Sequence, residues 1–382
     1  METQTIRKIL TRDFILCFFA QFTFTFVFFN LIPTLPIYLS RLGSTEAEIG
    51  VLIGVSAASS LVVRLFVGRA LLKTPEKNFM IAGLLIVTFT SAAYLLAPPF
   101  WPFLIVRVFQ GIGFALFSTA SFTLIANISS KAHRGQSLGY FTLSFTIAGA
   151  LAPPLGMFLI NRFSFPVLFL ACSGLSLCSL LITHQLGRRQ VVPLQNSSIE
   201  DGLLLSRGAI SPSIIGFFSF FIWGALTAFF PLYAINHGVT NPGFFFSTTA
   251  IVLILSRSLG GKILDLESRE KVILPCLMSY IISMVILAFS ETLPMFILVA
   301  VIYAMGPAFL TPTLLAYALD RGGAPGPAMG TFHAITDLGI SLGPVMMGIV
   351  IDSTSYPIMF LCLALMGIAN LNYFYFFVRK KG

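Results

Sequence analysis

The sequence predicts an all-α membrane protein whose twelve transmembrane helices form two six-helix bundles, related by a pseudo-two-fold axis along the membrane normal. Composition, the length of the apolar runs and an internal repeat predict this fold. Of the 382 residues, 57% are hydrophobic and only 10% are charged, and the mean hydropathy is +0.93. A soluble domain has about 25% charged residues. This chain has too few charged residues to form a water-exposed surface.

The apolar runs have the length of about 20 residues that crosses roughly 30 Å of hydrocarbon. Helices are expected because lipid leaves each backbone polar group to be satisfied within its own segment. The runs also lack the alternation that a membrane β-barrel would require. We expect the spans at 14–39, 47–72, 78–97, 101–126, 136–160, 164–186, 210–235, 244–265, 272–290, 293–318, 327–351 and 355–378.

The first span follows a basic start but continues to Leu39, which is too long for the core of a signal peptide. We therefore expect it to be retained. Of the 23 Lys and Arg residues, only Arg41 and Arg162 fall in loops on the outer side when the N-terminus is placed in the cytoplasm. We expect both termini in the cytoplasm. The net charge of +9 then reflects topology, and we expect no nucleic-acid partner.

The second half of the chain repeats the first. Pro36-x-Tyr38 and Gly43 return as Pro231-x-Tyr233 and Gly238, and further matching blocks follow in the same order. We expect an N-terminal bundle at 1–187, a cytoplasmic linker at 188–209 and a C-terminal bundle at 210–382. A parallel repeat of this kind places a substrate site near the midplane between the halves and suits alternating access.

Three motifs resemble those of the major facilitator superfamily, most closely its drug/proton antiporters. Arg107-Val-Phe-Gln110-Gly111-Ile-Gly113 is similar to the family's R-x-x-Q-G-x-G motif, and Gly339-x-x-x-Gly343-Pro344 is similar to its antiporter-associated G-x-x-x-G-P motif. The family loop G-x-x-x-D-R-x-G-R lacks its Asp after Gly68, whereas the second-half copy retains it as Asp265. The departure puts the first-half gating contact in doubt.

Arg107 lies about two turns into the fourth span. A charge inside the bilayer is costly and marks a functional site by default. We expect the guanidinium to face the central cavity, and the resemblance implies a role in proton coupling. Snorkelling to the interface, or bonding to backbone carbonyls, is the alternative.

Asp337 lies about three turns into the eleventh span, with His333 one turn before it on the same face. Burial disfavours the charged carboxylate, so Asp337 is a candidate protonatable switch. In the fold that the resemblance implies, Arg64 on helix 2 lies at a comparable depth. We predict an Arg64–Asp337 pair that latches the inner gate and weakens on protonation. A static pair that only fixes packing is the alternative.

Arg257 is the repeat counterpart of Arg64, but the counterpart of Asp337 is Thr146, which carries no acid. We expect Arg257 to bond helix-5 carbonyls or Asp265, in a mainly structural role. These two residues complete the set of candidates for coupling and gating.

Two further sets of residues are expected to shape the transport route. Polar and aromatic candidates for lining the substrate cavity are Gln21, Thr25, Asn30, Gln110, Trp223, Tyr303 and Thr311. Residues expected to allow close helix contact or helix bending are Gly111, Gly113, Pro153, Gly339, Gly343 and Pro344. The sparse polar lining favours an amphiphilic solute over a sugar, because buried unpaired polar groups are costly.

These observations predict a secondary active transporter, not an enzyme, that exports small amphiphilic compounds in exchange for protons. A metabolite, sugar or metal-chelator transporter working in either direction is an alternative, and a transporter-like sensor or lipid scrambling protein is another. We expect no cofactor, no metal and no catalytic residue. The expected partners are a small-molecule substrate, protons and the lipid bilayer. We expect a monomer in the bacterial cytoplasmic membrane.

Overall fold

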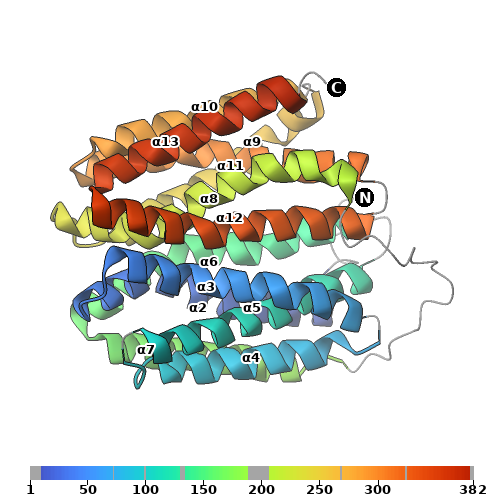
Figure 1. Cartoon of the computed structure of the whole chain (residues 1–382). Helices are drawn as coiled ribbons and strands as arrows, with labels where there is room; N and C mark the ends of the chain where they lie inside the picture. Colours follow the sequence, from blue (N-terminus) through green and yellow to red (C-terminus); the bar gives the residue numbers. More distant parts are fainter. Residues whose placement is uncertain are drawn as a thin grey trace. The chain divides into compact units, whose positions relative to one another are not determined.

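The computed structural model describes residues 10–71, 73–98, 100–129, 134–187, 206–266, 269–322 and 325–378. All regular structure in these ranges is helical (Figure 1). The helices are α2 (Arg12–Arg41), α3 (Glu46–Ala70), α4 (Glu76–Ala93), α5 (Trp101–Ile128), α6 (Arg134–Arg162), α7 (Phe165–His184), α8 (Arg207–Asn236), α9 (Gly243–Leu266), α10 (Arg269–Ala288), α11 (Leu293–Arg321), α12 (Pro325–Ser353) and α13 (Tyr356–Tyr373), with a short π-helix at Phe374–Val378.

These helices confirm the all-α prediction, and each one matches a predicted span. Within the described ranges, ten are long and apolar enough to cross a membrane. The third span was expected to continue to residue 97, but α4 ends at Ala93 with Tyr94 as its C-cap. After Ala93 the backbone tightens into turns, in which the Leu95 and Leu96 N–H groups donate to carbonyls three residues back at 3.0 and 3.1 Å. Pro98 then disfavours a helical conformation at Ala97.

The chain divides into two compact units. Unit 1 comprises residues 1–32 and 58–197, and unit 2 comprises residues 33–57 and 198–382. The end of α2 and the start of α3 thus lie in unit 2, although the sequence repeat assigns them to the first half. The predicted boundaries at 187 and 210 were drawn from the sequence repeat, whereas the two units are defined by which residues pack together. The units therefore do not test these boundaries, which stay a prediction.

Unit 1 is built around close contacts of α4 with α5 and α7. Gly83 on α4 faces Gly113 on α5, where an added Cβ would lie 2.9 Å from the Gly83 carbonyl oxygen. The first part of α2 joins this unit through α7, since the Ser179 hydroxyl donates to the Ala20 carbonyl at 2.7 Å. Small residues therefore bring the backbones of α4 and α5 into direct contact.

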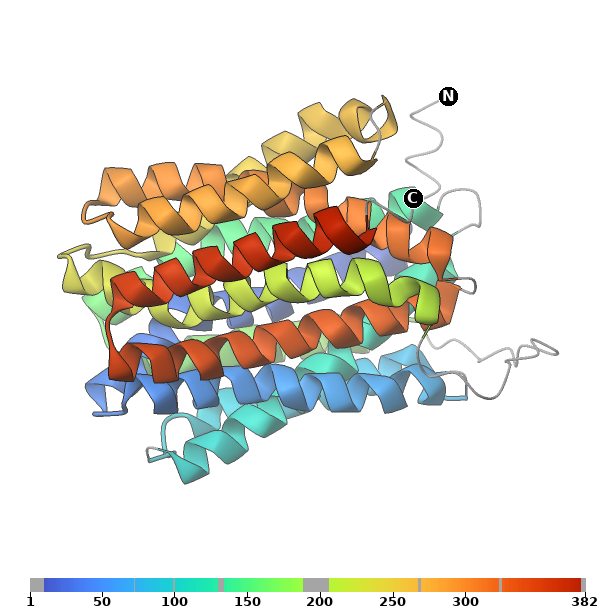
Figure 2. The same ribbon diagram turned by 45° about the horizontal axis from the view of Figure 1, so that its top comes forward.

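In unit 2, α8 packs against α11, α12 and α13, and α10 packs against α11 and α13 (Figure 1). Figure 2 shows α12 lying along α8. A Cβ on Gly339 would lie 3.1 Å from the Phe221 amide nitrogen, and one on Gly343 would lie 3.2 Å from that of Ala225. The predicted close contact at both glycines is thus made with the backbone of α8.

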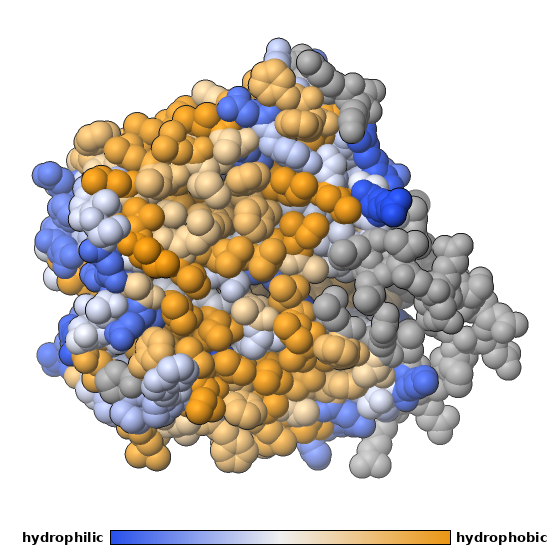
Figure 3. Space-filling view, viewed as in Figure 1, coloured by the Kyte–Doolittle hydropathy of each residue, from blue (hydrophilic) through white to orange (hydrophobic). Residues whose placement is uncertain are grey.

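The surface is that of a protein surrounded by lipid. On the face in Figure 3, apolar side chains cover the middle of the helices and hydrophilic ones gather towards their ends. Large apolar side chains such as Phe66, Phe89 and Leu365 are mostly exposed. Monomeric soluble proteins rarely expose a continuous apolar surface of this extent.

Candidate functional site

A hydrogen-bonded cluster of buried polar residues surrounds Arg107 in unit 1. The Arg107 Nη1 group donates to Gln110 Oε1 at 2.5 Å, and the Tyr94 hydroxyl donates to the same oxygen at 2.5 Å. Arg107 is 7% exposed and Gln110 is fully buried. The spacing of three residues on α5 places Arg107 and Gln110 on one helix face. Arg107 and Gln110, the two polar residues of the sequence motif, are therefore in direct contact in the fold.

A second polar cluster joins α2 to α5. Gln21 donates through Nε2 to the Thr25 hydroxyl at 2.8 Å and accepts from the Ser121 hydroxyl at 2.8 Å. Asn30, further along α2, donates to the Phe26 carbonyl at 3.0 Å. Gln21, Thr25 and Asn30 are all buried. In this conformation the three candidate cavity residues are buried in unit 1 and form hydrogen bonds there.

Aromatic side chains gather around Trp223 in unit 2. The Trp223 ring stacks on Tyr303 at a centroid separation of 6.2 Å and meets Phe246 edge-on at 6.0 Å. Tyr303 is buried, whereas Trp223 and Thr311 are partly exposed. The structure therefore brings Trp223 and Tyr303 together and leaves part of the indole accessible.

Asp337 lies inside α12 and is 8% exposed. The adjacent Thr336 hydroxyl donates to the Phe332 carbonyl at 3.0 Å. His333, one turn earlier, is exposed. The two titratable residues share a helix face by spacing, but only the carboxyl group is buried.

Arg64 is partly buried on α3, with its guanidinium 5.5 Å from the centre of the Phe114 ring in unit 1. This distance permits a cation–π interaction. The predicted Arg64–Asp337 pair joins residues of different units and stays a prediction. Arg257 and Asp265 lie on α9, but outside the residues whose side chains are described, so their predicted roles also stay open.

Other proline and glycine candidates lie within helices. Pro153 is in α6 and Pro344 is in α12. A Cβ on Gly224 of α8 would lie 3.0 Å from the Pro344 ring, so this proline packs where α8 and α12 touch. Gly111 is buried on α5 beside the Arg107 cluster.

The start of α3 is bound by residues that the sequence analysis did not select. The Asp352 carboxylate accepts the backbone N–H groups of Glu46 at 3.0 Å and Ala47 at 3.1 Å. Thr45 and Glu48 form a reciprocal capping box, with bonds of 3.0 and 3.2 Å. The first three N–H groups of α3 are thus all satisfied. We call this arrangement the α3 clasp.

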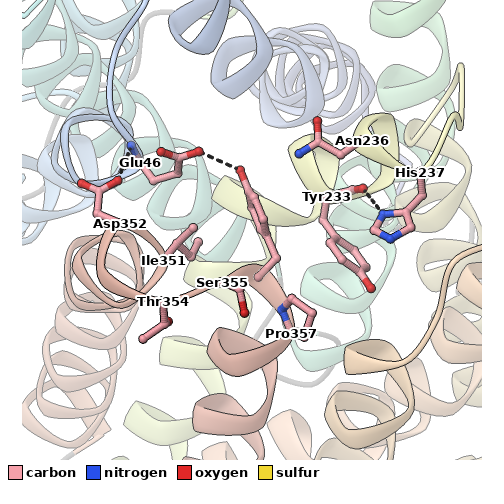
Figure 4. Close-up of a pocket in the computed structure, with 10 residues that line it drawn as sticks. Glu46, Tyr233, Asn236, His237, Ile351, Asp352, Thr354, Ser355 and Pro357 are labelled. Atoms are coloured by element: carbon pink, nitrogen blue, oxygen red, sulfur yellow. Dashed lines mark hydrogen bonds between the residues drawn. The ribbon is translucent and has the colours of Figure 1, made fainter.

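The α3 clasp borders a pocket of about 390 Å³ in unit 2 (Figure 4). The Tyr356 hydroxyl donates to Glu46 at 3.2 Å, and His237 Nδ1 lies 2.8 Å from the Tyr233 carbonyl oxygen. The T-x-x-E pattern at Thr45–Glu48 is a signal that could have located this helix start. No sequence pattern links it to Asp352, which lies about 300 residues away.

Long apolar helices with a few buried polar and charged groups define a multi-pass membrane protein. The sequence profile of the Major Facilitator Superfamily matches residues 17–325 and again 240–382, and the chain belongs to this superfamily.

Two relatives and one solved structure illustrate the similarity. The Staphylococcus aureus staphylopine export protein is 23% identical, over 90% of this chain and 91% of its own. The quinolone resistance protein NorA of the same species is 22% identical, over 84% of this chain and 85% of its own. The nucleoside transporter NupG has the same fold, with a TM-score of 0.78, 17% identity and coverage of 96% and 100%. The comparisons confirm the family resemblance and the transport class.

Proposed function

We propose that this protein is a secondary transporter that exports small amphiphilic compounds in exchange for protons. The observation that carries the proton coupling is the burial of Asp337 inside an apolar helix. Two relatives, an export protein and a quinolone resistance protein, support the direction and the substrate class. The partly exposed Trp223 beside Tyr303 offers an aromatic surface for such a solute.

Proton uptake by Asp337 would lower the free energy needed to bury this part of α12 in apolar surroundings. A charged carboxylate needs polar partners or water, whereas the protonated form tolerates an apolar environment. A conformational equilibrium shifts only by the difference in proton affinity between its states. Asp337 would couple the proton to transport if one state of the cycle solvates the carboxylate better than the other.

Flux measurements in proteoliposomes test this proposal. We expect a fluorescent quinolone to move against its concentration gradient when a pH gradient is imposed. Asp337→Asn keeps the shape of the side chain but cannot take up a proton. We expect it to lose the dependence on the pH gradient and to retain movement down a concentration gradient.

The matched control is Asp320→Asn, an exposed acid at the end of α11 in the same unit. It should transport as the unmodified protein does. Full gradient-driven flux through Asp337→Asn would contradict the coupling role. Absence of gradient-driven flux over a broad panel of compounds would instead favour a sensor or a lipid scrambling protein.

A second candidate function is export of a polar metabolite. The specific observation in its favour is the similarity to the staphylopine export protein over nearly the full length of both chains. Staphylopine and the quinolone can be compared in the same vesicles. Gradient-driven flux of staphylopine alone would select this second candidate.

We also propose that the protein works as a monomer in the bacterial cytoplasmic membrane, with both termini in the cytoplasm. The near absence of Lys and Arg from the expected outer loops supports this orientation.

A further inference from the structure

Tyr94 is buried at the end of α4, in surroundings that hold its ring in place. The ring centre lies 4.8 Å from that of Phe103 on α5 and 5.3 Å from that of Phe169 on α7. Tyr94 is fully buried. A buried phenol needs a partner for its hydroxyl group, and Gln110 Oε1 supplies it at 2.5 Å.

The oxygen that Tyr94 uses is also the acceptor for Arg107. An amide oxygen has two lone pairs, so it can accept both bonds at once. If the amide were reversed, its NH₂ group would face the guanidinium, which carries a positive charge and has no acceptor. The two bonds therefore fix which way the Gln110 side chain points.

No other hydrogen bond fixes this amide within the part of the chain that the structure describes. Gln110 Nε2 is buried and has no hydrogen-bond partner there. The orientation of the side chain thus depends on its oxygen, and the oxygen depends on Tyr94 and Arg107. Removing the phenol would leave Arg107 as the one donor among these residues that orients the amide.

The contact between α4 and α5 explains how Tyr94 reaches this position. A Cβ on Gly83 would lie 2.6 Å from the Gly113 carbonyl oxygen, and one on Gly113 would lie 2.8 Å from the Val87 side chain. The two antiparallel helices therefore run with their backbones in contact. This packing holds the end of α4 beside the α5 segment that carries Arg107 and Gln110.

We propose that Tyr94 is a positioning residue that holds the Arg107 guanidinium in place, both by direct side-chain contact and through the Gln110 oxygen that the two residues share. Its importance for transport rests on the proposed function and on the role in proton coupling that the family resemblance implies for Arg107. Tyr94 acts on the orientation of the Gln110 amide and thereby on the location of a buried positive charge.

The transport test uses Tyr94→Phe, which keeps the ring and removes only the donor. We expect gradient-driven flux to fall about fivefold, the change that loss of a hydrogen bond worth about 1 kcal/mol produces. In a Gln110→Leu background the same substitution should have a clearly smaller effect, because Tyr94 acts in part through Gln110. Tyr140→Phe, which removes a phenol from α6, is the matched control.

A second readout does not depend on transport. Reaction of arginine residues with a dicarbonyl reagent, resolved by mass spectrometry, reports how firmly each guanidinium is held. We expect labelling of Arg107 to rise about fivefold in Tyr94→Phe, while labelling of the exposed Arg162 stays constant. If Tyr94→Phe does not fold, Gln110→Asn withdraws the same oxygen and should raise Arg107 labelling likewise.

The two readouts separate the two proposals. Unchanged Arg107 labelling, or an undiminished effect of Tyr94→Phe in the Gln110→Leu background, would overturn the positioning role. If the unmodified protein shows no gradient-driven flux while Tyr94→Phe still releases Arg107, the proposed function fails and the positioning role stands.

Discussion

Gly43 and Gly238 each follow a helix in the left-handed region of backbone conformation, with φ angles of 84° and 77°. In both turns the next residue donates to a carbonyl five residues back, Ser44 to Leu39 at 3.1 Å and Val239 to Ala234 at 3.0 Å. This is the bonding of a Schellman motif. The two glycines are also counterparts in the sequence repeat, so the repeat preserves a helix end down to its hydrogen bonds.

Gly238→Ala is expected to destabilise the protein by about 1 kcal/mol, because a Cβ is disfavoured at positive φ. Space is not the cause, since no atom lies within 4 Å of an added Cβ. Thermal unfolding in detergent measures the effect. Gly174→Ala, at an equally open position inside α7, should be neutral or slightly stabilising. Equal melting temperatures for both variants would contradict the explanation.

The candidate site could be predicted only in part at this scale. Arg107 and Gln110 stand three apart on one helix, so their contact follows from helical periodicity. Tyr94 could not be predicted as their partner. It follows the end of α4, where the turn geometry and the register between α4 and α5 decide its reach, and neither is encoded in a local pattern.

Among the elements, α3 has a start whose N–H groups are satisfied by two different parts of the chain. Thr45 and Glu48 are local to the helix, whereas Asp352 comes from the end of α12. A carboxylate at a helix N-terminus also interacts favourably with the helix dipole. Gly348 allows this approach, since a Cβ there would lie 3.0 Å from the Ala47 Cα atom.

Asp352→Ala is expected to lower the unfolding free energy by about 1 kcal/mol, the usual effect of losing a helix cap. The N–H groups of Glu46 and Ala47 would then turn to water. Ser353→Ala is the control, because the neighbouring Ser353 hydroxyl bonds only carbonyls of its own helix turn, at 2.9 and 3.1 Å. Denaturant or thermal unfolding compares the two variants. An effect of Asp352→Ala no larger than that of Ser353→Ala would show that Asp352 adds no stability to the start of α3.

For the whole molecule, the distribution of charge predicts that the C-terminus and the linker at 188–209 lie on the same side of the membrane. A protease-cleavable tag after Gly382 and another inserted after Ser197 should both be cut in inverted vesicles and protected in intact cells. A tag inserted after Thr240, in the loop between α8 and α9, should behave in the opposite way. Cleavage of the first two tags from opposite sides would refute an even number of spans between them.

Much of the architecture was predictable because the bilayer restricts it. A span must be helical, about 20 residues long and mostly apolar, so composition alone locates it. Helix ends were less predictable, because an apolar run can continue past the last helical residue. This happens at Ala93, where α4 ends although the following residues are still apolar. The assignment of residues 33–57 to unit 2 was not predictable, because a repeat in sequence does not specify which surfaces pack together.

That assignment has a practical consequence for anyone who divides or recombines this chain. A fragment beginning in the linker would carry Asp352 without the amides it binds and Gly348 without the backbone that covers it. A chimera joined to a relative only at the linker would take residues 33–57, with the N–H groups of Glu46 and Ala47, from one parent. It would take Asp352, the residue that accepts those two hydrogen bonds, from the other parent. A functional exchange of modules should therefore transfer residues 33–57 together with the C-terminal helices, using three junctions instead of one.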